Sequence, residues 1–327
     1  MGAERVTEWA RDLGLRVPVV CAPMGGAAGG ELATAVSRAG GLGMIGMGSA
    51  ASVPALEREL AALGEDIGGV DGHPFGIGLV AWGIERDRVL FERALAAGPA
   101  LVSVSFGDWV GAERAPEWIA AVHDVGAVAV TQAATAEEAE RAAEAGVDVI
   151  VARGREGGGH GDHQEPRDEL LQAVLAVVDV PVLAAGGIVT ATDLERVLDA
   201  GAAGAWVGTA FAACAEALTP PAAREVMFAS DAGDTLVTRV FDVALELPWP
   251  SRFPERLIRT PFIDRWHGRA NELARDAAAR AEFRAAVEAG DYTVVPVDAG
   301  EGVGRIERLR TAAEVIEALT APTPSAS

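Results

Sequence analysis

Eight short apolar runs, each nearly continuous in Val, Ile, Leu and Ala, alternate with segments of helical pattern along most of the chain. Runs of this kind are typical of strands in a parallel sheet that is covered on both faces. In the segments between them, apolar residues recur at helical spacing, and several segments end in Ala-Gly, a common helix stop. The predicted strands are residues 18–22, 41–45, 75–80, 101–106, 127–131, 148–152, 181–185 and 205–207.

Eight strand–helix repeats within 327 residues predict an α/β protein of the (β/α)8 TIM-barrel class. A doubly wound sheet is the alternative fold for strands that alternate with helices. The segment after the first predicted strand reads Ala22-Pro23-Met24-Gly25-Gly26, which does not match the G-x-G-x-x-G fingerprint of a dinucleotide-binding sheet. The barrel is therefore the preferred prediction.

The pattern changes after the last predicted strand. Residues 217–291 are helical in pattern and rich in Arg and Glu, and several prolines interrupt them. We therefore divide the chain into a barrel over residues 1–216, a helical subdomain over 217–291 inserted after strand 8 as a lid, and a C-terminal segment over 292–327 that returns to the barrel. The small residues of 321–327 predict a disordered tail.

Composition excludes several classes of function. The chain contains no lysine, so all 27 basic residues are arginine. Schiff-base chemistry with pyridoxal phosphate or an aldolase lysine is thereby excluded, as is a Gly-Lys-Ser/Thr phosphate loop. The net charge of -21 argues against nucleic acid and anionic membrane surfaces as partners.

The expected location is the cytoplasm. No apolar run reaches the roughly 18 residues that a membrane span needs, and residues 1–14 lack the apolar region of a secretory signal. The two cysteines, Cys21 and Cys214, are interpreted as buried small residues rather than as a disulfide.

A glycine-rich loop with one histidine follows the sixth predicted strand and reads Gly-Arg-Glu-Gly-Gly-Gly-His-Gly over residues 154–161. Glycine has no Cβ, so backbone N–H groups in such a loop can come close to a ligand. His160 can exchange a proton near neutral pH. Two further turns, Gly186-Gly187 and Gly208-Thr209, follow later strands, at the barrel end where ligands bind. These loops predict a phosphate cradle for a cofactor, with a general base beside it.

These motifs resemble those of the nitronate monooxygenases, formerly called 2-nitropropane dioxygenases, over residues 17–319. Members are FMN-dependent (β/α)8 barrel enzymes related to the FMN-containing enoyl-acyl-carrier-protein reductases. The resemblance is carried by Ala22-Pro23-Met24, Ala152-x-Gly154-x-Glu156-Gly157-Gly158-Gly159-His160, Gly186-Gly187-Ile188, Gly208-Thr209-x-Phe211 and Asp234-Thr235-x-x-Thr238-Arg239-x-Phe241.

The resemblance implies a role for each matching residue. His160 matches the catalytic base. The other matching positions are those of the FMN phosphate site (Gly186, Gly187, Gly208, Thr209), the segment against the flavin ring (Ala22, Pro23, Met24) and further FMN contacts (Gln132, Arg153, Gly158). Two residues depart from the family pattern: Gly78 stands where Asn is frequent, and Arg153 where Gln is common.

The implied activity is the oxidation of a nitronate or nitroalkane by O2 to a carbonyl compound and nitrite, by an enzyme that could form a homodimer. One alternative keeps FMN but uses NAD(P)H to reduce an enoyl thioester or a quinone. A second alternative, a flavin-binding protein without turnover, is disfavoured because His160 accompanies all three loops.

No metal site is predicted. His163 lies near Asp162 and Glu165 in the sequence, and this group could suggest one. The polar rim of the glycine loop explains these residues better, and the family that the chain resembles uses no metal.

Overall fold

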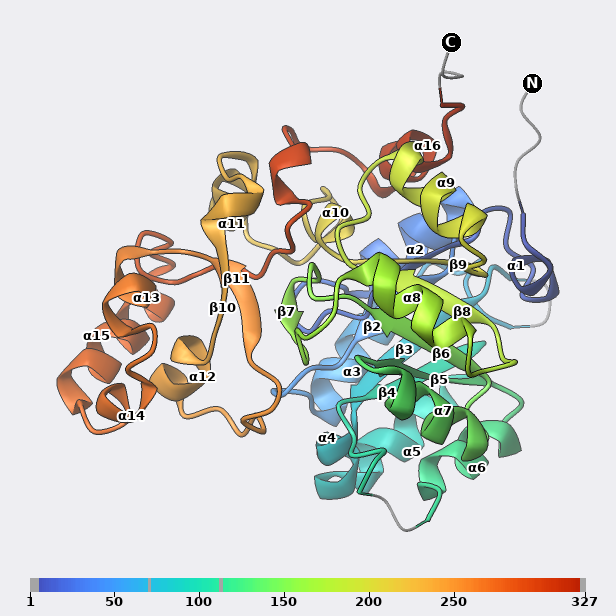
Figure 1. Ribbon diagram of the computed structural model, residues 1–327, viewed down its shortest axis with the longest axis horizontal. Coiled ribbons are helices and arrows are strands. Elements are labelled where there is room, and N and C mark those ends of the chain that lie inside the picture. Colours follow the sequence, from blue (N-terminus) through green and yellow to red (C-terminus); the bar gives the residue numbers. More distant parts are fainter. Residues whose placement is uncertain (1–5, 70–71, 112–113, 324–327) are drawn as a thin grey trace.

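The first part of the chain folds into a closed barrel of eight parallel strands (Figure 1). The computed structural model describes residues 6–69, 72–111 and 114–323. The strands follow the order β1-β9-β8-β6-β5-β4-β3-β2, and a parallel bridge between Val20 and Leu42 joins the two ends of this order. The predicted (β/α)8 barrel is confirmed, because this closure does not occur in a doubly wound sheet.

Each barrel strand lies within one or two residues of its predicted position. Their bounds are β1 (Val19–Cys21), β2 (Gly43–Gly46), β3 (Phe75–Val80), β4 (Leu101–Ser105), β5 (Val128–Ala133), β6 (Val149–Arg153), β8 (Val182–Ala185) and β9 (Gly204–Val207). Nearly all of their residues are buried, which agrees with the continuous apolar runs in the sequence.

Helices surround the barrel, and the last one closes the ring by packing against α2 and α9. They are α1 (Glu8–Asp12), α2 (Gly30–Ala39), α3 (Val53–Ala61), α4 (Ala81–Arg86), α5 (Arg88–Ala96), α6 (Glu117–Asp124), α7 (Ala136–Glu144), α8 (Arg167–Leu175), α9 (Ala191–Asp199), α10 (Thr209–Ala212) and α16 (Ala312–Thr320). Local sequence sets their ends. Thr190 and Asp193 form a capping box at the start of α9, and Gly40 ends α2 in the left-handed conformation at φ 102°.

A second lobe follows β9 and projects to one side of the barrel, in orange at the left of Figure 1. The segment begins with α11 (Pro221–Phe228), whose Ala223 and Met227 belong to the barrel's apolar core. The lobe itself contains η1 (Ala232–Asp234), β10 (Thr235–Thr238), α12 (Val240–Leu245), β11 (Glu255–Ile258), α13 (Pro261–Trp266), α14 (Ala270–Leu273) and α15 (Ala277–Ala289). Its own apolar core includes Val240, Leu257, Phe262 and Phe283. The structure adds two strands to the helices expected here. Both strands carry β-branched or aliphatic residues, which favour a strand.

A short three-stranded sheet joins this lobe to the glycine-rich loop of the barrel. β11 pairs antiparallel with β10 and with the two-residue strand β7 (Gly159–His160). In this pairing Glu255 lies opposite His160, and Arg256 lies opposite Gly159. The pairing therefore brings side chains of the second lobe to the histidine selected from the sequence.

A short helix, η2 (Val303–Arg305), precedes α16. Cys21 and Cys214 are both free and buried, as expected. Within the described residues, no helix combines the length and apolar character that crossing a bilayer requires. Residues 324–327 of the predicted tail and residues 1–5 lie outside the described residues.

Candidate active site

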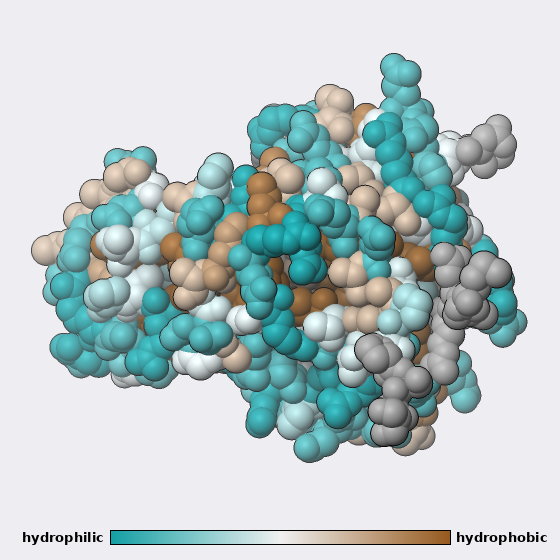
Figure 2. All heavy atoms as spheres, turned by 90° about the horizontal axis from the view of Figure 1, so that it is seen from above, coloured by the Kyte–Doolittle hydropathy of each residue, from teal (hydrophilic) through white to brown (hydrophobic). Residues whose placement is uncertain are grey.

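A cavity of about 660 Å³ lies at the carboxyl end of the barrel strands and extends to the second lobe. Figure 2 shows apolar residues gathered around the hollowed middle of this face, between the second lobe and the barrel. All residues assigned to catalysis or FMN binding from the sequence line this one cavity. They are Ala22, Pro23, Met24, Gln132, Arg153, Gly158, His160, Gly186, Gly187, Gly208 and Thr209.

The glycine-rich loop packs against another backbone segment at Gly158, and this contact leaves no room for a side chain there. Gly186 and Gly187 both have left-handed φ angles, 115° and 66°. A Cβ on Gly158 would lie 2.5 Å from the amide nitrogen of Gly300. That same Gly300 N–H donates to Thr209 Oγ1 over 3.0 Å, so the Thr209 hydroxyl retains its own proton for another acceptor.

Arg305 anchors the Gly187 end of this cradle, and no sequence motif pointed to this residue. Its guanidinium donates to the carbonyl oxygen of Gly187 over 2.6 Å and pairs with Asp193 over 2.6 Å. Asp193 also accepts hydrogen bonds from the N–H groups of Val189 and Thr190. The late Gly-rich turn that precedes Arg305 was the one available signal, since it brings residues 299–305 back to the barrel.

Arg153 binds two backbone carbonyl groups of the glycine-rich loop. Its Nη2 donates to the carbonyl oxygen of Gly158 over 2.8 Å and to that of Gly159 over 3.3 Å. Its Nη1 is buried without a hydrogen-bond partner. Burial lowers the pKa of Arg153 to about 10, and the positive charge of Arg256 contributes. The guanidinium remains charged at neutral pH and fixes the loop that carries His160.

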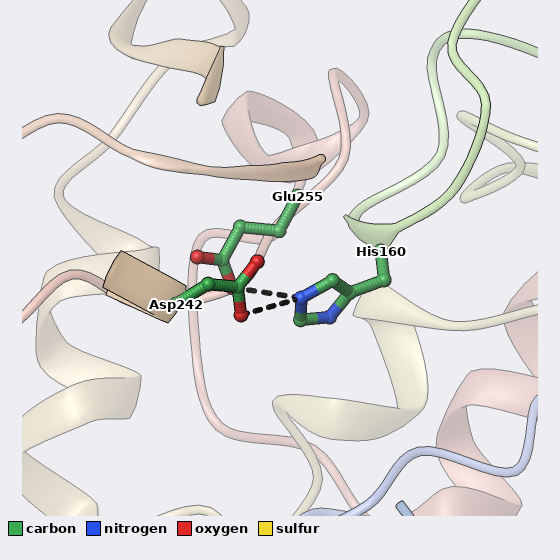
Figure 3. Close-up of side chains that lie close together, drawn as sticks. All are labelled: His160, Asp242 and Glu255. Atoms are coloured by element: carbon green, nitrogen blue, oxygen red, sulfur yellow. Dashed lines mark hydrogen bonds and ion pairs between the residues drawn. The ribbon is translucent and has the colours of Figure 1, made fainter. Parts of the chain in front are cut away.

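His160 contacts the second lobe on two sides, through Asp242 and Trp249, and Figure 3 shows the carboxylate side of this contact. Its Nε2 lies 3.0 Å from Oδ1 of Asp242, which belongs to α12. The indole of Trp249, in the loop after α12, stacks on the imidazole with ring centres 3.7 Å apart and planes 8° apart. The His160 side chain is 12% exposed and that of Asp242 is 3% exposed, so both are shielded from bulk water.

A second carboxyl group lies behind this pair. Oε2 of Glu255 lies 3.9 Å from Nε2 of His160, and Oε1 of Glu255 is buried with no hydrogen-bond partner. Burial raises the pKa of Glu255 well above its usual range, and the negative charges of Asp298 and Asp242 raise it further. Burial also raises the pKa of Asp298, against the lowering effect of His160. The Glu255 carboxyl therefore favours the protonated form.

Among the described residues, one group of side chains is arranged closely enough to hold a metal ion. His160, Asp242 and Glu255 offer ligand atoms within 4.8 Å of one another. The group suggested by the sequence is different, and the structure does not assemble it. His163 lies between the carbonyl oxygens of Arg155 and Gly159, at 3.1 and 3.2 Å. Burial, with the charge of Arg153, lowers its pKa to about 3.

An aromatic wall covers the histidine side of the cavity. Phe106 packs edge-to-face against Trp249 at 4.9 Å and against Phe253 at 5.3 Å, measured between ring centres. Its φ of 67° is unusual for a residue other than glycine. Backbone strain of this kind clusters at functional sites. Both Met24 and Phe106 line the cavity and offer it apolar surface.

Comparisons with known proteins agree with this geometry. A model of the family described as nitronate monooxygenase matches residues 82–322. The chain belongs to this family. It is 33% identical to a nitronate monooxygenase of Pseudomonas aeruginosa over 276 residues, which cover 70% of this chain and 75% of that protein.

Other relatives carry different names. The chain is 30% identical, over 77% of its length and 66% of the other protein's, to a 5-hydroxy-7a-methyl-1-oxo-octahydro-1H-indene-4-carboxyl-CoA dehydrogenase of Mycobacterium tuberculosis. The fold matches FabK from Thermotoga maritima with a TM-score of 0.79 and 26% identity, over 96% of this chain and 94% of that one. It also matches a nitroalkane oxidase from Streptomyces ansochromogenes with a TM-score of 0.77 and 28% identity, over 95% and 96% of the two chains. The protein is thus an oxidoreductase of the nitronate monooxygenase type.

Proposed function

We propose that this protein binds FMN and oxidises a nitroalkane or its nitronate with O2 to a carbonyl compound and nitrite, with His160 as general base. One observation carries the proposal. His160, paired with a buried carboxylate, lines the same cavity as the glycine turns after β8 and β9. A proton acceptor and a phosphate-type cradle within one cavity are the parts that this reaction needs. The family membership supports the same activity.

The residues of the cavity fit an FMN phosphate. The left-handed backbone at Gly186 and Gly187 gives a phosphate close access to main-chain N–H groups. The Thr209 hydroxyl can donate one hydrogen bond, and the Arg305 guanidinium, which is paired with Asp193, anchors the carbonyl oxygen of Gly187. A Cβ on Gly208 would make only ordinary contacts, with Met24 Sδ at 3.6 Å and Ala22 Cβ at 3.8 Å, and Gly208 itself lines the cavity. A dianion can thus be held without lysine.

The remaining cavity residues suit the flavin ring. We assign Ala22, Pro23 and Met24 to contact with the ring, and Gln132, Arg153 and Gly158 to its polar edge. When bound, FMN would supply the electron-accepting and O2-activating chemistry, since side chains do not accept electron pairs readily. The protein's own part is to orient the substrate, hold the proton at His160 and limit the access of water.

The proton step uses His160. A neutral nitroalkane is oxidised readily only after its α-proton has been removed, and a positioned base typically contributes ~10²–10⁴-fold to such a step. The Trp249 indole fixes the plane of the imidazole ring. We propose that residues 217–291 act as the lid of the site, because they supply Trp249, Asp242 and Glu255 to the barrel's cavity.

The decisive experiment uses the purified yellow protein. Acid precipitation should release one FMN per chain, and aerobic turnover of a nitronate should yield nitrite and carbonyl compound in equal amounts. Anaerobic mixing with the nitronate should bleach the flavin, and mixing with NADH or NADPH should leave it yellow. Release of FAD, or a protein that never takes up flavin, would exclude the proposal.

A second candidate is an NAD(P)H-dependent reductase or a dehydrogenase of thioesters. It is favoured by the 30% identity to a carboxyl-CoA dehydrogenase. The lining of the cavity also includes the apolar residues Ala50, Ala51, Leu218 and Met227, which offer more surface than a small nitroalkane needs. Fast bleaching by NADH or NADPH, with reoxidation by an enoyl thioester or a quinone, would support this candidate over the oxidase.

A further inference from the structure

The two nitrogens of His160 have different surroundings. Nε2 points toward the carboxyl groups of Asp242 and Glu255, and Nδ1 lies on the side of the ring turned away from both (Figure 3). An ionised carboxylate can only accept hydrogen bonds, so the ring nitrogen next to it must carry a proton. A neutral imidazole has one N–H, which leaves Nδ1 with its lone pair.

From this geometry we propose that Asp242 is a positioning residue for His160. Its carboxylate accepts the Nε2–H and fixes the tautomer in which Nδ1 is the base. This inference rests on the proposed function, since it assigns a role within the same proton-transfer step.

In the proposed proton transfer, the α-carbon–hydrogen bond of the nitroalkane breaks, and the proton forms a new N–H bond at Nδ1 of His160. The electron pair stays on the substrate, which becomes a nitronate. The imidazolium that results is stabilised by the negative charge of Asp242 at 3.0 Å. An Asp that orients a catalytic histidine works in this way in serine hydrolases, where its loss costs about 10⁴-fold in rate.

Asp242 fits this role better than Glu255. The oxygen of Asp242 lies at hydrogen-bond distance from Nε2, and the nearer oxygen of Glu255 is 3.9 Å away, beyond that range. Trp249 stacks on the ring and the β7–β11 pairing fixes the backbone of His160, so the ring cannot turn easily to exchange its partners.

Several charged groups act on His160 and its partners, and they come from different elements. They are Asp242 of α12, Glu255 of β11, Asp298 of the segment before η2, and Arg153 of β6. Only Asp242 is within hydrogen-bond distance of the ring. Removing the charge of Asp242 should therefore change the proton affinity of His160, whereas removing an exposed charge on the same lobe should not.

The kinetic test compares Asp242→Asn with Glu246→Gln. Glu246 is the exposed C-cap of α12 and pairs with Arg280 and Arg284, so it serves as the matched control. With fresh nitroethane, Asp242→Asn should lose about 10²–10⁴-fold in kcat/KM, and with the preformed nitronate it should lose less than about tenfold. FMN content should remain that of the wild type. Equal losses on both substrates would overturn the proposal.

The pH profile supplies a readout that a purely structural role would not move. For the neutral nitroalkane, kcat/KM should rise with pH as His160 loses its proton. In Asp242→Asn this rise should move to lower pH, because the anion that favours the imidazolium is gone. Glu246→Gln should leave it in place. A pH profile that is unchanged in Asp242→Asn would refute the assignment of Asp242 as a positioning residue.

A spectroscopic test is independent of turnover. The holoenzyme labelled with ¹⁵N-histidine contains five histidines, and His160→Asn identifies the signal of His160. The ¹⁵N shifts should show a protonated Nε2 and an unprotonated Nδ1 in the wild type, and a mixture of tautomers in Asp242→Asn. The opposite tautomer in the wild type would overturn the inference even if nitroalkane oxidation is confirmed. The expected tautomer without nitroalkane turnover would reject the proposed function alone.

Discussion

Replacing Gly158 with alanine should force two loops of the cavity apart. The new Cβ would lie 2.5 Å from the nitrogen of Gly300 and 2.6 Å from the carbonyl carbon of Ala299. Ordinary contact begins at 3.4 Å, so the loops must separate by about 0.9 Å. Both neighbours are main-chain atoms, which cannot rotate away as a side chain could. Gly158 lines the cavity, so this movement changes the proposed FMN site directly.

The expected cost follows from overpacking, which typically destabilises by about 1–3 kcal/mol. At roughly 2.1 cal/mol/K per residue, the entropy of unfolding of 327 residues is about 0.7 kcal/mol/K. The melting temperature of the apoprotein should therefore fall by about 1.5–4 °C. If the loops separate and relieve the strain, the same free energy appears as FMN affinity weaker by about 5- to 150-fold.

Calorimetry of the apoprotein and an FMN titration together measure this cost. Gly233→Ala is the matched control, because its Cβ would meet no atom within 4 Å and its backbone is not left-handed. It should retain wild-type stability and affinity. The reasoning is refuted if Gly158→Ala cannot be distinguished from Gly233→Ala in both measurements, since the backbone contact would then not exist.

Three further variants test the site. His160→Asn should keep FMN and lose most turnover of a neutral nitroalkane, with a smaller loss on the nitronate; equal losses in a steady-state assay would remove His160 from the base role. Gly187→Asp should lose FMN and stay folded by circular dichroism, since its carboxylate would face the phosphate; unchanged flavin absorbance would place the phosphate elsewhere. Glu255→Gln tests the raised pKa of the Glu255 carboxyl. A raised pKa means that the native state binds more protons than the unfolded state, so wild-type stability falls as pH rises above about 4.3, the unfolded value. Glu255→Gln should therefore gain in melting temperature over the wild type from pH 5 to pH 8, and a constant difference would contradict the shift.

The barrel could be predicted from the sequence because its signals are local. Each strand is a mostly apolar run, and several helices carry a side-chain cap, such as Thr135 before α7 or Thr190 before α9. The glycine turns are local signals too, since they immediately follow β6, β8 and β9. The residues that line the cavity could therefore be selected together without knowledge of their distances.

The partners of His160 could not be selected in this way. Asp242 lies 82 residues further along the chain, and no periodicity links the two positions. The pairing that brings Glu255 opposite His160 uses a strand of only two residues, which is too short to leave an alternating pattern. Phe241 is the last residue of one of the motifs that carry the family resemblance. Asp242 is the next residue, but no sequence pattern marked it as functional.

The structure explains why Gly78 departs from the family pattern. Gly78 stands in β3 where asparagine is frequent in the family, and the sequence suggests that an amide beside the flavin is missing. In this chain, a Cβ at position 78 would lie 2.2 Å from Cβ and Cγ of Pro23. The Pro23 ring already fills that space, and Pro23 lines the cavity next to Met24. Gly78 is thus required by the contact between β3 and the segment after β1.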